Sequence, residues 1–166
     1  MITFKEFLNE RVTTVKPTAK TIVSLYDFGN MILRGESIDD VEISENDITG
    51  LFYNCHGVKS LPLFGTSKVT IMNYTFESCE DLETIPEFNT SNVKEMQGTF
   101  KYCYRLKHIP HLDTSNVTNM KYTFDYCKSI QTIERPSDWY KYDWNSKDAP
   151  QHLKDKYPEL YNKELR

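Results

Sequence analysis

The segment DTSNVTNMKYTFDYCKSI at residues 113–130 decides the fold, because close copies of it precede it at intervals of 24 residues. The copies read NTSNVKEMQGTFKYCYRL at residues 89–106 and GTSKVTIMNYTFESCEDL at residues 65–82. An eroded earlier copy keeps the apolar positions Ile48, Phe52, Cys55, Val58 and Leu61. A fixed period of this length is typical of repeat proteins whose units bury their apolar faces only against neighbouring units. The sequence therefore predicts one stack of four repeats, or of three repeats and a cap.

Each repeat has two parts with different spacing. In the first part, Val117, Met120, Phe124 and Cys127 are three or four residues apart, which favours a short helical or irregular segment. The second part is an apolar pair closed by proline in three copies, too short for a helix, and it predicts a short strand. Strands of successive repeats would pair in parallel about 4.8 Å apart. The predicted fold class is an α/β solenoid with 24-residue repeats, short parallel strands, and N- and C-terminal caps.

Composition limits the classes of partner. The chain has 166 residues, enough for one domain with a real core, and 20 Lys and Arg against 24 Asp and Glu give a formal charge of -4. With no basic tract, a nucleic-acid partner has little electrostatic support. No apolar run approaches the roughly 18 residues that span a bilayer, and the start does not look like a secretory signal. We therefore expect a cytoplasmic protein with no membrane or nucleic-acid partner.

The four cysteines occupy equivalent positions of the repeats. Equivalent positions in a stack form a line, whereas zinc needs a tetrahedral cluster of ligands. We expect buried, reduced thiols, because free cysteine is also a compact core residue. A disulfide between neighbouring repeats is the first alternative and a metal site the second. No cofactor is predicted.

The order of turn, Met, Phe, Cys and strand residues from Asp113 to Ile130 resembles the BspA-type leucine-rich repeat of bacterial surface proteins. The resemblance covers about residues 41–136. It departs in period by a residue or two, and Thr75, Thr99 and Thr123 stand where the family usually has a second Met. Membership implies a curved leucine-rich-repeat stack and a role in protein binding. It does not imply a particular ligand, because function belongs to the surface.

The first ten residues, MITFKEFLNE, look unlike the repeats. Their lead sequence, residues 3–7, and the Leu8-Asn9-Glu10 tripeptide resemble the capsid-targeting peptide of internal head proteins in large myovirus-type tailed phages. That resemblance implies cleavage after Glu10 by the prohead protease, with Arg11 as the mature start. Cleavage would leave a charge of -3, whereas many internal head proteins are basic. The alternative is that this amphipathic segment only caps the stack.

The predicted organisation has four parts. They are a cleavable peptide at 1–10, an N-terminal cap with a helix or hairpin at 11–40, the repeats at 41–136, and a C-terminal cap with a short amphipathic helix at 137–166. Asp27-Phe28-Gly29 invites a comparison with kinases, but no Gly-rich loop or His-Arg-Asp accompanies it. We expect Phe28 to belong to the cap.

Motifs for catalysis are missing from the sequence. No Ser/His/Asp arrangement has a supporting motif, and the one closely spaced histidine pair, His108 and His111, flanks Pro110 on a strand and is expected to be solvated. No catalytic residue and no metal ligand is predicted. The sequence therefore predicts a protein that is not an enzyme.

A stack presents one residue per repeat in columns, and such columns form its binding face. Tyrosines gather in the last two repeats, and tyrosine and arginine are common anchors at protein interfaces. The candidate contact residues are Tyr102, Tyr104, Arg105, Tyr122 and Tyr126, with Lys107, His108, His111 and Arg135 on neighbouring columns. The alternative is that the tyrosines only pack the outer side of the repeats.

The functional hypothesis combines the repeats and the N-terminal resemblance. It is a non-enzymatic phage protein, packaged in the capsid interior and delivered to the bacterial cytoplasm to inhibit or redirect a host protein, with anti-phage defence proteins among the possible targets. The alternative is an adhesin-like or structural repeat module without packaging. A catalytic domain would need a pocket with perturbed acids or histidines. A homodimer through an open end or face of the stack also fits the sequence.

Overall fold

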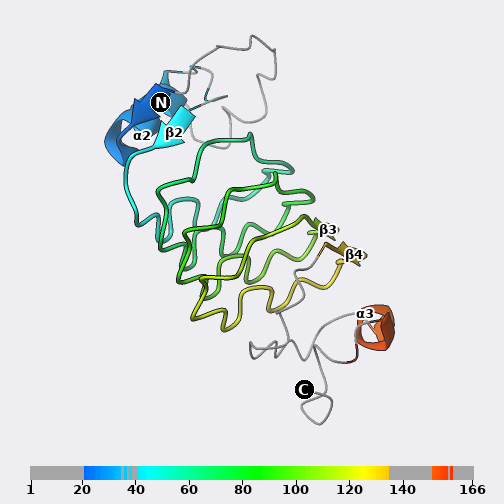
Figure 1. Cartoon of the computed structure of the whole chain (residues 1–166). Coiled ribbons are helices and arrows are strands. Elements are labelled where there is room, and N and C mark those ends of the chain that lie inside the picture. The colour runs from blue at the N-terminus through cyan, green and yellow to red at the C-terminus, as the bar shows by residue number, and fades with distance from the viewer. Residues whose placement is uncertain are drawn as a thin grey trace.

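Residues 41–134 form a repetitive structure with few short parallel strands. The computed structural model describes residues 21–34, 36, 38, 41–134, 151–156 and 158. The chain winds through a series of similar turns that lie one upon the next (Figure 1). The assigned elements are β1 (Thr21–Val23), α2 (Leu25–Leu33), β2 (Val41–Ile43), β3 (His108–Ile109), β4 (Thr132–Ile133) and α3 (Gln151–Lys156). We number the repeats I (46–69), II (70–93), III (94–117) and IV (118–134).

The predicted strands lie where the apolar pairs precede proline. β3 pairs in parallel with β4, with His108 opposite Thr132 and Ile109 opposite Ile133. The same column continues to repeats I and II as the parallel bridge between Ser60 and Thr84. The prediction of short parallel strands is confirmed. They stay short because a proline, with no N–H to donate, follows the pair in repeats I to III.

A second parallel ladder lies in the first part of each repeat, where the sequence left a helical or an irregular segment open. Its bridges join Asp47, Ile71, Glu95 and Asn119 in turn. The helical alternative is wrong, because residues 44–134 contain no helix. The amide N–H groups here bond to carbonyls of the next repeat and not four residues back along the chain. Examples are Phe52 to Thr75, Phe76 to Thr99 and Phe100 to Thr123, at 2.8–2.9 Å.

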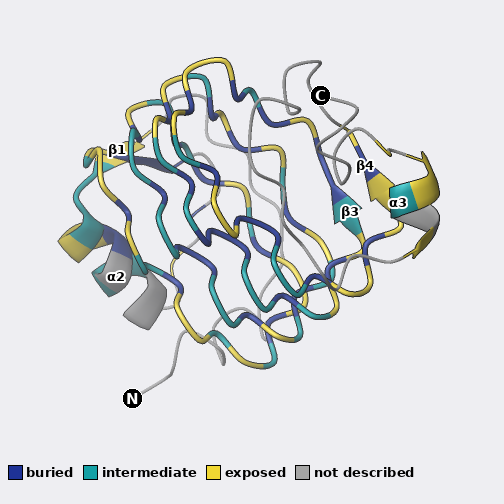
Figure 2. Cartoon of the chain, turned by 90° about the horizontal axis from the view of Figure 1, so that it is seen from below, coloured by how far each residue is buried: buried dark blue, intermediate teal, exposed yellow. Residues whose placement is uncertain are grey.

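The core contains two columns of aromatic rings. Phe52, Phe76, Phe100 and Phe124 stack nearly parallel, with ring centroids 5.1–5.4 Å apart and interplanar angles of 4–8°. Half a repeat further along the chain, Phe64 and Phe88 form a second column, with Leu112 also buried. The sequence reasoning missed this second column. Figure 2 shows the buried segments of successive turns side by side, with exposed residues at the bends.

Thr75, Thr99 and Thr123, which precede Phe76, Phe100 and Phe124, are buried yet hydrogen-bonded. The Thr99 hydroxyl lies 2.8 Å from the carbonyl oxygens of both Met72 and Met96, and Thr123 repeats this arrangement one repeat later. A buried hydroxyl without a partner would cost about 1–3 kcal/mol. The departure from the usual Met therefore places a polar side chain between two neighbouring turns, where it bridges their backbones.

Residues 21–43, which overlap the predicted N-terminal cap, form a parallel strand–helix–strand unit. β1 pairs with β2 in parallel, which rules out the hairpin alternative for residues 21–43, and α2 connects the two strands. Ser24 caps α2, since its hydroxyl accepts from the amide N–H of Asp27 at 3.0 Å. Phe28 is fully buried against Phe52 and Phe64, as expected of a cap residue.

Only part of the predicted C-terminal cap is described. α3 confirms helical structure at residues 151–156, whereas 137–150 lie outside the described residues. The predicted peptide at residues 1–10, with Leu8 and Glu10, and the start at Arg11 also lie outside them. Within the described parts of the chain, no helix is both long and apolar enough to cross a bilayer.

Candidate functional site

Aromatic rings and ammonium groups alternate on the outer turns of repeats III and IV. We call this surface the tyrosine–lysine patch and define it by Lys101, Tyr102, Tyr104, Tyr122, Tyr126 and Lys128. Its residues flank the core positions Phe100, Cys103, Phe124 and Cys127, whose side chains point into the stack. The two elements that position the patch are therefore the equivalent turns of two neighbouring repeats.

The patch is held together by ring contacts. The rings of Tyr102 and Tyr126, one repeat apart, have centroids 4.8 Å apart and planes inclined by 31°. The ring centroid of Tyr104 lies 6.0 Å from that of Tyr102. Lys101 Nζ lies 4.8 Å from the centroid of Tyr102 and 5.7 Å from that of Tyr122. The four predicted tyrosines are thus brought together by direct contacts or through Lys101.

Lys128 lies between two rings of the patch. Its Nζ is 5.9 Å from the Tyr104 centroid and 5.7 Å from the Tyr126 centroid. Cation–π contacts of this kind contribute roughly 0.5–1 kcal/mol at exposed sites. Lys128 is itself exposed, so its ammonium group is held by rings while remaining open to solvent.

Three tyrosines of the patch have backbone conformations that side chains usually avoid. The φ angles of Tyr102, Tyr122 and Tyr126 are 62°, 61° and 61°. The left-handed region costs an L-residue roughly 1–2 kcal/mol. Hydrogen bonds between repeats hold the turn, as in the 2.9 Å bond from the Tyr102 amide to the Asp125 carbonyl. Glycine fills one of these turn positions in repeat III, Gly98, without that cost.

Lys101 is charged and compensated from within the chain. Its Nζ lies 3.6 Å from Glu77 Oε1, and its side chain is only 24% exposed. Partial desolvation lowers the pKa of Lys101, but the neighbouring Tyr102, Glu77 and Asp125 outweigh it and raise the pKa overall. Lys101 therefore orients two rings and has its charge balanced locally.

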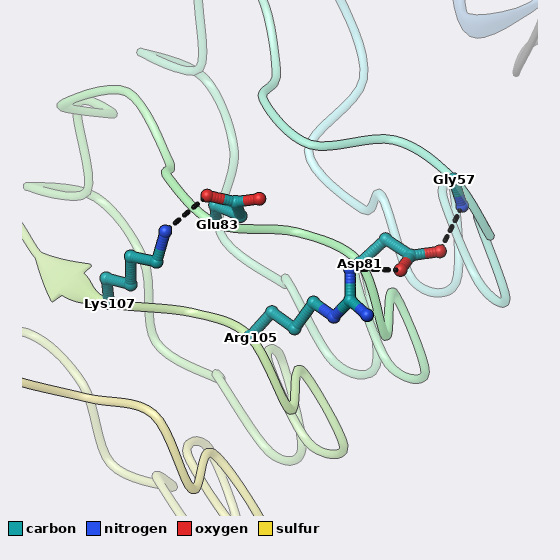
Figure 3. Close-up of polar contacts among 5 residues, drawn as sticks. All are labelled: Gly57, Asp81, Glu83, Arg105 and Lys107. Carbon is teal, nitrogen blue, oxygen red and sulfur yellow. Dashed lines mark hydrogen bonds and ion pairs between the residues drawn. The ribbon is translucent and has the colours of Figure 1, made fainter.

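Arg105 and Lys107 form ion pairs with the preceding repeat (Figure 3). Arg105 Nη1 lies 3.3 Å from Asp81, which also accepts a 2.8 Å bond from the amide of Gly57. Lys107 Nζ lies 2.5 Å from Glu83. These predicted contact residues thus tie repeats II and III together.

The remaining predicted contact residues lie apart from the ring contacts. His108 is on β3, where its Nδ1 lies 2.6 Å from the Thr132 hydroxyl and its Nε2 3.5 Å from Glu134. His111 is exposed, as predicted. Arg135 lies outside the described residues. The structure therefore links the tyrosines into one patch but does not link the histidines to it.

The cysteines form the predicted line of thiols. Cys79, Cys103 and Cys127 are buried, and their thiols donate to the carbonyl oxygens of the phenylalanines one repeat earlier, at 3.1–3.3 Å. Burial raises the pKa of Cys103 and Cys127. Cys55 is half-buried, and its hydrogen bond with Cys79 lowers its pKa. In the part of the chain that the structure describes, no cluster of three His, Cys, Asp or Glu could hold a metal ion.

Sequence reasoning missed the two lysines of the patch. The signal was present in the 24-residue period, because Lys128 occupies the position of Tyr104 one repeat later, and Lys101 directly precedes Tyr102. Placing the two repeats in register would have put an ammonium group beside each pair of rings.

The class of domain is that of a leucine-rich-repeat-like domain, since the described repeats are stacked turns with short parallel strands. The family described as "Mycoplasma protein of unknown function, DUF285" matches residues 46–151. The chain belongs to this family, whose match spans more than half of its length. Neither a curated protein nor a solved structure matches the chain. The family match lends no support to an origin in phage heads.

Proposed function

We propose that this chain is a non-enzymatic protein-binding module, a BspA-type leucine-rich-repeat solenoid that contacts its partner through the tyrosine–lysine patch. The observation that carries the proposal is the row of tyrosines held at positive φ on the outer turns of repeats III and IV. Asn54, Tyr74 and Ser78 share this conformation in repeats I and II, so the turn belongs to the repeat, and what marks repeats III and IV is that tyrosine, a bulky residue uncommon at positive φ, fills it repeatedly.

The chemistry of the patch favours a protein partner. Tyrosine presents a large ring and a polar tip with few rotatable bonds, so ordering it on binding costs little entropy. Contacts with Lys101, Tyr126 and Tyr104 already fix the ring of Tyr102 before any partner arrives. Preorganised contact residues of this kind raise affinity by reducing the cost of binding.

The experiment compares capture by three full-length baits from lysate of the cells in which the protein acts. The baits are the unchanged chain, the double variant Tyr102→Ala/Tyr126→Ala, and the control Tyr53→Ala, which removes a tyrosine that is 58% exposed in repeat I. A specific partner should be retained by the first and third baits and lost from the second, with circular dichroism confirming that all three fold. Equal retention by all three would refute the assignment of the patch.

Delivery from a phage head to a bacterial host protein stays a proposal that rests on the N-terminal peptide alone. Its support is the lead sequence at residues 3–7 together with Leu8 and Glu10, a region that the family match does not reach. The mass and N-terminus of the chain in purified particles would test it. A form beginning at Arg11 would support packaging with cleavage, and absence from particles would remove it.

An adhesin-like or structural module is the second candidate, and the resemblance of residues 41–136 to repeats of bacterial surface proteins favours it. The two candidates differ in location. Immunolabelling of intact, unpermeabilised cells would detect a surface module, whereas a protein acting in the cytoplasm would appear only after permeabilisation.

A further inference from the structure

We propose that the tyrosine–lysine patch takes an acidic segment of its partner, with one carboxylate on Lys128 and apolar or prolyl neighbours on the rings of Tyr104 and Tyr126. This inference rests on the proposed function, because it names the chemistry of the partner at the same surface. It follows from which cations at this edge of the stack already pair with carboxylates of the chain and which one does not.

Three of the four Lys and Arg residues of repeat III are paired within the chain, and the fourth, Lys94, lies outside the patch. Lys101, Arg105 and Lys107 lie 3.6, 3.3 and 2.5 Å from acids of repeat II, each pair 24 residues apart. Figure 3 shows two of these pairs side by side across neighbouring turns. These three charges are therefore satisfied before a partner binds and contribute little to choosing one.

Lys128 differs from them. Its equivalent one repeat earlier is Tyr104, so the acid of the column, Glu80, is two repeats away instead of one. Among the described residues, no carboxylate forms an ion pair with Lys128. Its nearest recorded groups are the rings of Tyr104 and Tyr126. Of the two lysines of the patch, Lys128 is thus the exposed one that pairs with no carboxylate among the described residues, and it can meet a partner's carboxylate.

The rings of Tyr104 and Tyr126 favour apolar residues on either side of the partner's carboxylate. An ion pair between exposed groups contributes little on its own, because both groups are well hydrated. Rings on two sides of Lys128 Nζ, within 6 Å of it, would cover part of an incoming carboxylate and give its apolar neighbours a surface to pack on. A single acidic residue flanked by leucine or proline fits this arrangement better than a run of acids.

The negative charge of repeat II disfavours a second carboxylate of the partner on that side of the patch. Repeat II holds five acids, Glu77, Glu80, Asp81, Glu83 and Glu87, and no Lys or Arg. A second carboxylate extending from the patch toward repeat II would meet like charge, which is unfavourable. The proposed segment therefore has its acidic residue over repeat IV and neutral or basic residues toward repeat II.

The test uses the full-length protein and three labelled twelve-residue peptides that differ at one central position. The peptides carry Glu, Gln or Lys there, flanked by Leu and Pro, and binding is followed by fluorescence anisotropy. We expect the Glu peptide to bind about fivefold more tightly than the Gln peptide at low salt. The preference should nearly disappear at about 1 M salt, where charges are screened within about 3 Å.

Two matched variants locate the effect. Lys128→Gln should abolish the preference for Glu over Gln, while Lys59→Gln, which removes another exposed lysine in repeat I, should leave it unchanged. Equal binding of the Glu and Gln peptides would overturn the inference, as would a preference that survives Lys128→Gln or no binding of the Glu peptide at about 1 mM.

The inference and the proposed function fail in different ways. Partner capture that is lost with Tyr102→Ala/Tyr126→Ala but insensitive to Lys128→Gln would overturn only the acidic segment. Capture that ignores both variants would overturn the proposed function as well. A concentration-dependent increase in sedimentation coefficient, abolished by Lys128→Gln, would replace the acidic segment with a second copy of this chain.

Discussion

Replacing Gly98 by alanine should disturb the stack through one neighbour, Tyr74. Gly98 has a φ of 61°, and a Cβ built on it would lie 2.6 Å from Cδ1 and 2.7 Å from Cε1 of Tyr74. Tyr74 is the residue 24 positions earlier, and its ring lies over the backbone of Gly98. The Tyr74 hydroxyl also accepts a hydrogen bond from the side-chain amide of Gln97. Gly98→Ala must therefore displace the ring.

The expected cost has two parts. The left-handed backbone itself costs alanine roughly 1 kcal/mol relative to glycine. Displacing the Tyr74 ring loses its hydrogen bond and part of its packing, which adds about 1–2 kcal/mol. The sum is about 2–3 kcal/mol of unfolding free energy. With Tyr74→Ala already present, only the backbone part remains, so Gly98→Ala should then cost about 1 kcal/mol.

The assay is equilibrium unfolding in urea, followed by circular dichroism, for the unchanged protein, both single variants and the double variant. Two-state behaviour must be checked first, because repeat proteins can unfold in parts. A coupling free energy of about 1–2 kcal/mol between the two sites is predicted. If Gly98→Ala costs the same in both backgrounds, the packing of one repeat's turn upon the next is not as described.

Three further predictions follow from the core and the ion pairs. Iodoacetamide at neutral pH should alkylate Cys55 in the folded protein, because this thiol is only half-buried, whereas Cys79, Cys103 and Cys127 are buried and burial raises the pKa of Cys103 and Cys127. Mass spectrometry should find four modified cysteines only in urea. Phe100→Leu should cost about 2 kcal/mol in urea unfolding, because it removes two stacked ring contacts. Phe88→Leu, which removes one tilted and one stacked contact, should cost a similar amount, and a cost near zero for either variant would contradict the stack. Lys107 lowers the pKa of Glu83 in the folded protein, so this pair stabilises the folded state at pH values above the unfolded-state pKa near 4.5. Its contribution is lost as the pH falls below that value. Glu83→Gln should therefore flatten the acid limb of a curve of unfolding free energy against pH, and an unchanged limb would show that the pair contributes nothing.

The period carried most of what the sequence could predict about the fold. Aligning the cysteines located the short strands and the buried thiols, because stacked repeats place equivalent residues against one another. The second ladder through Ile71 and Glu95 was missed, because its bridges are single and its residues show no alternation. The spacing of three and four is shared by helices and by these turns, and the choice depends on hydrogen bonds between repeats that no single repeat contains.

The candidate site was predictable in part. Residue type singled out Tyr102, Tyr104, Tyr122 and Tyr126, and their contacts place them in one patch. Arg105 was grouped with them on residue type and Lys107 on its place in a neighbouring column, yet their acids lie one repeat earlier and pair with them. Charge pairing along a column is visible only when repeats are compared 24 residues apart.

The phenylalanine column at half the period was missed for a similar reason. Phe64 and Phe88 lie two residues after the proline that closes the strand, where the sequence reasoning assigned no core position. The chain turns inward there, and both rings are buried beside the first aromatic column. The proline correctly predicted the end of the strand, but it did not predict the direction of the chain after the strand.

The measurement that tests the central claim most directly is the position at which a captured partner touches this chain. A lysine-reactive cross-linker applied to the purified complex, followed by mass spectrometry, can report this with the native lysines alone. Contact through the tyrosine–lysine patch predicts cross-links at Lys121 and Lys128, both exposed in repeat IV. Cross-links confined to Lys59 and Lys68, exposed in repeat I, would contradict the account.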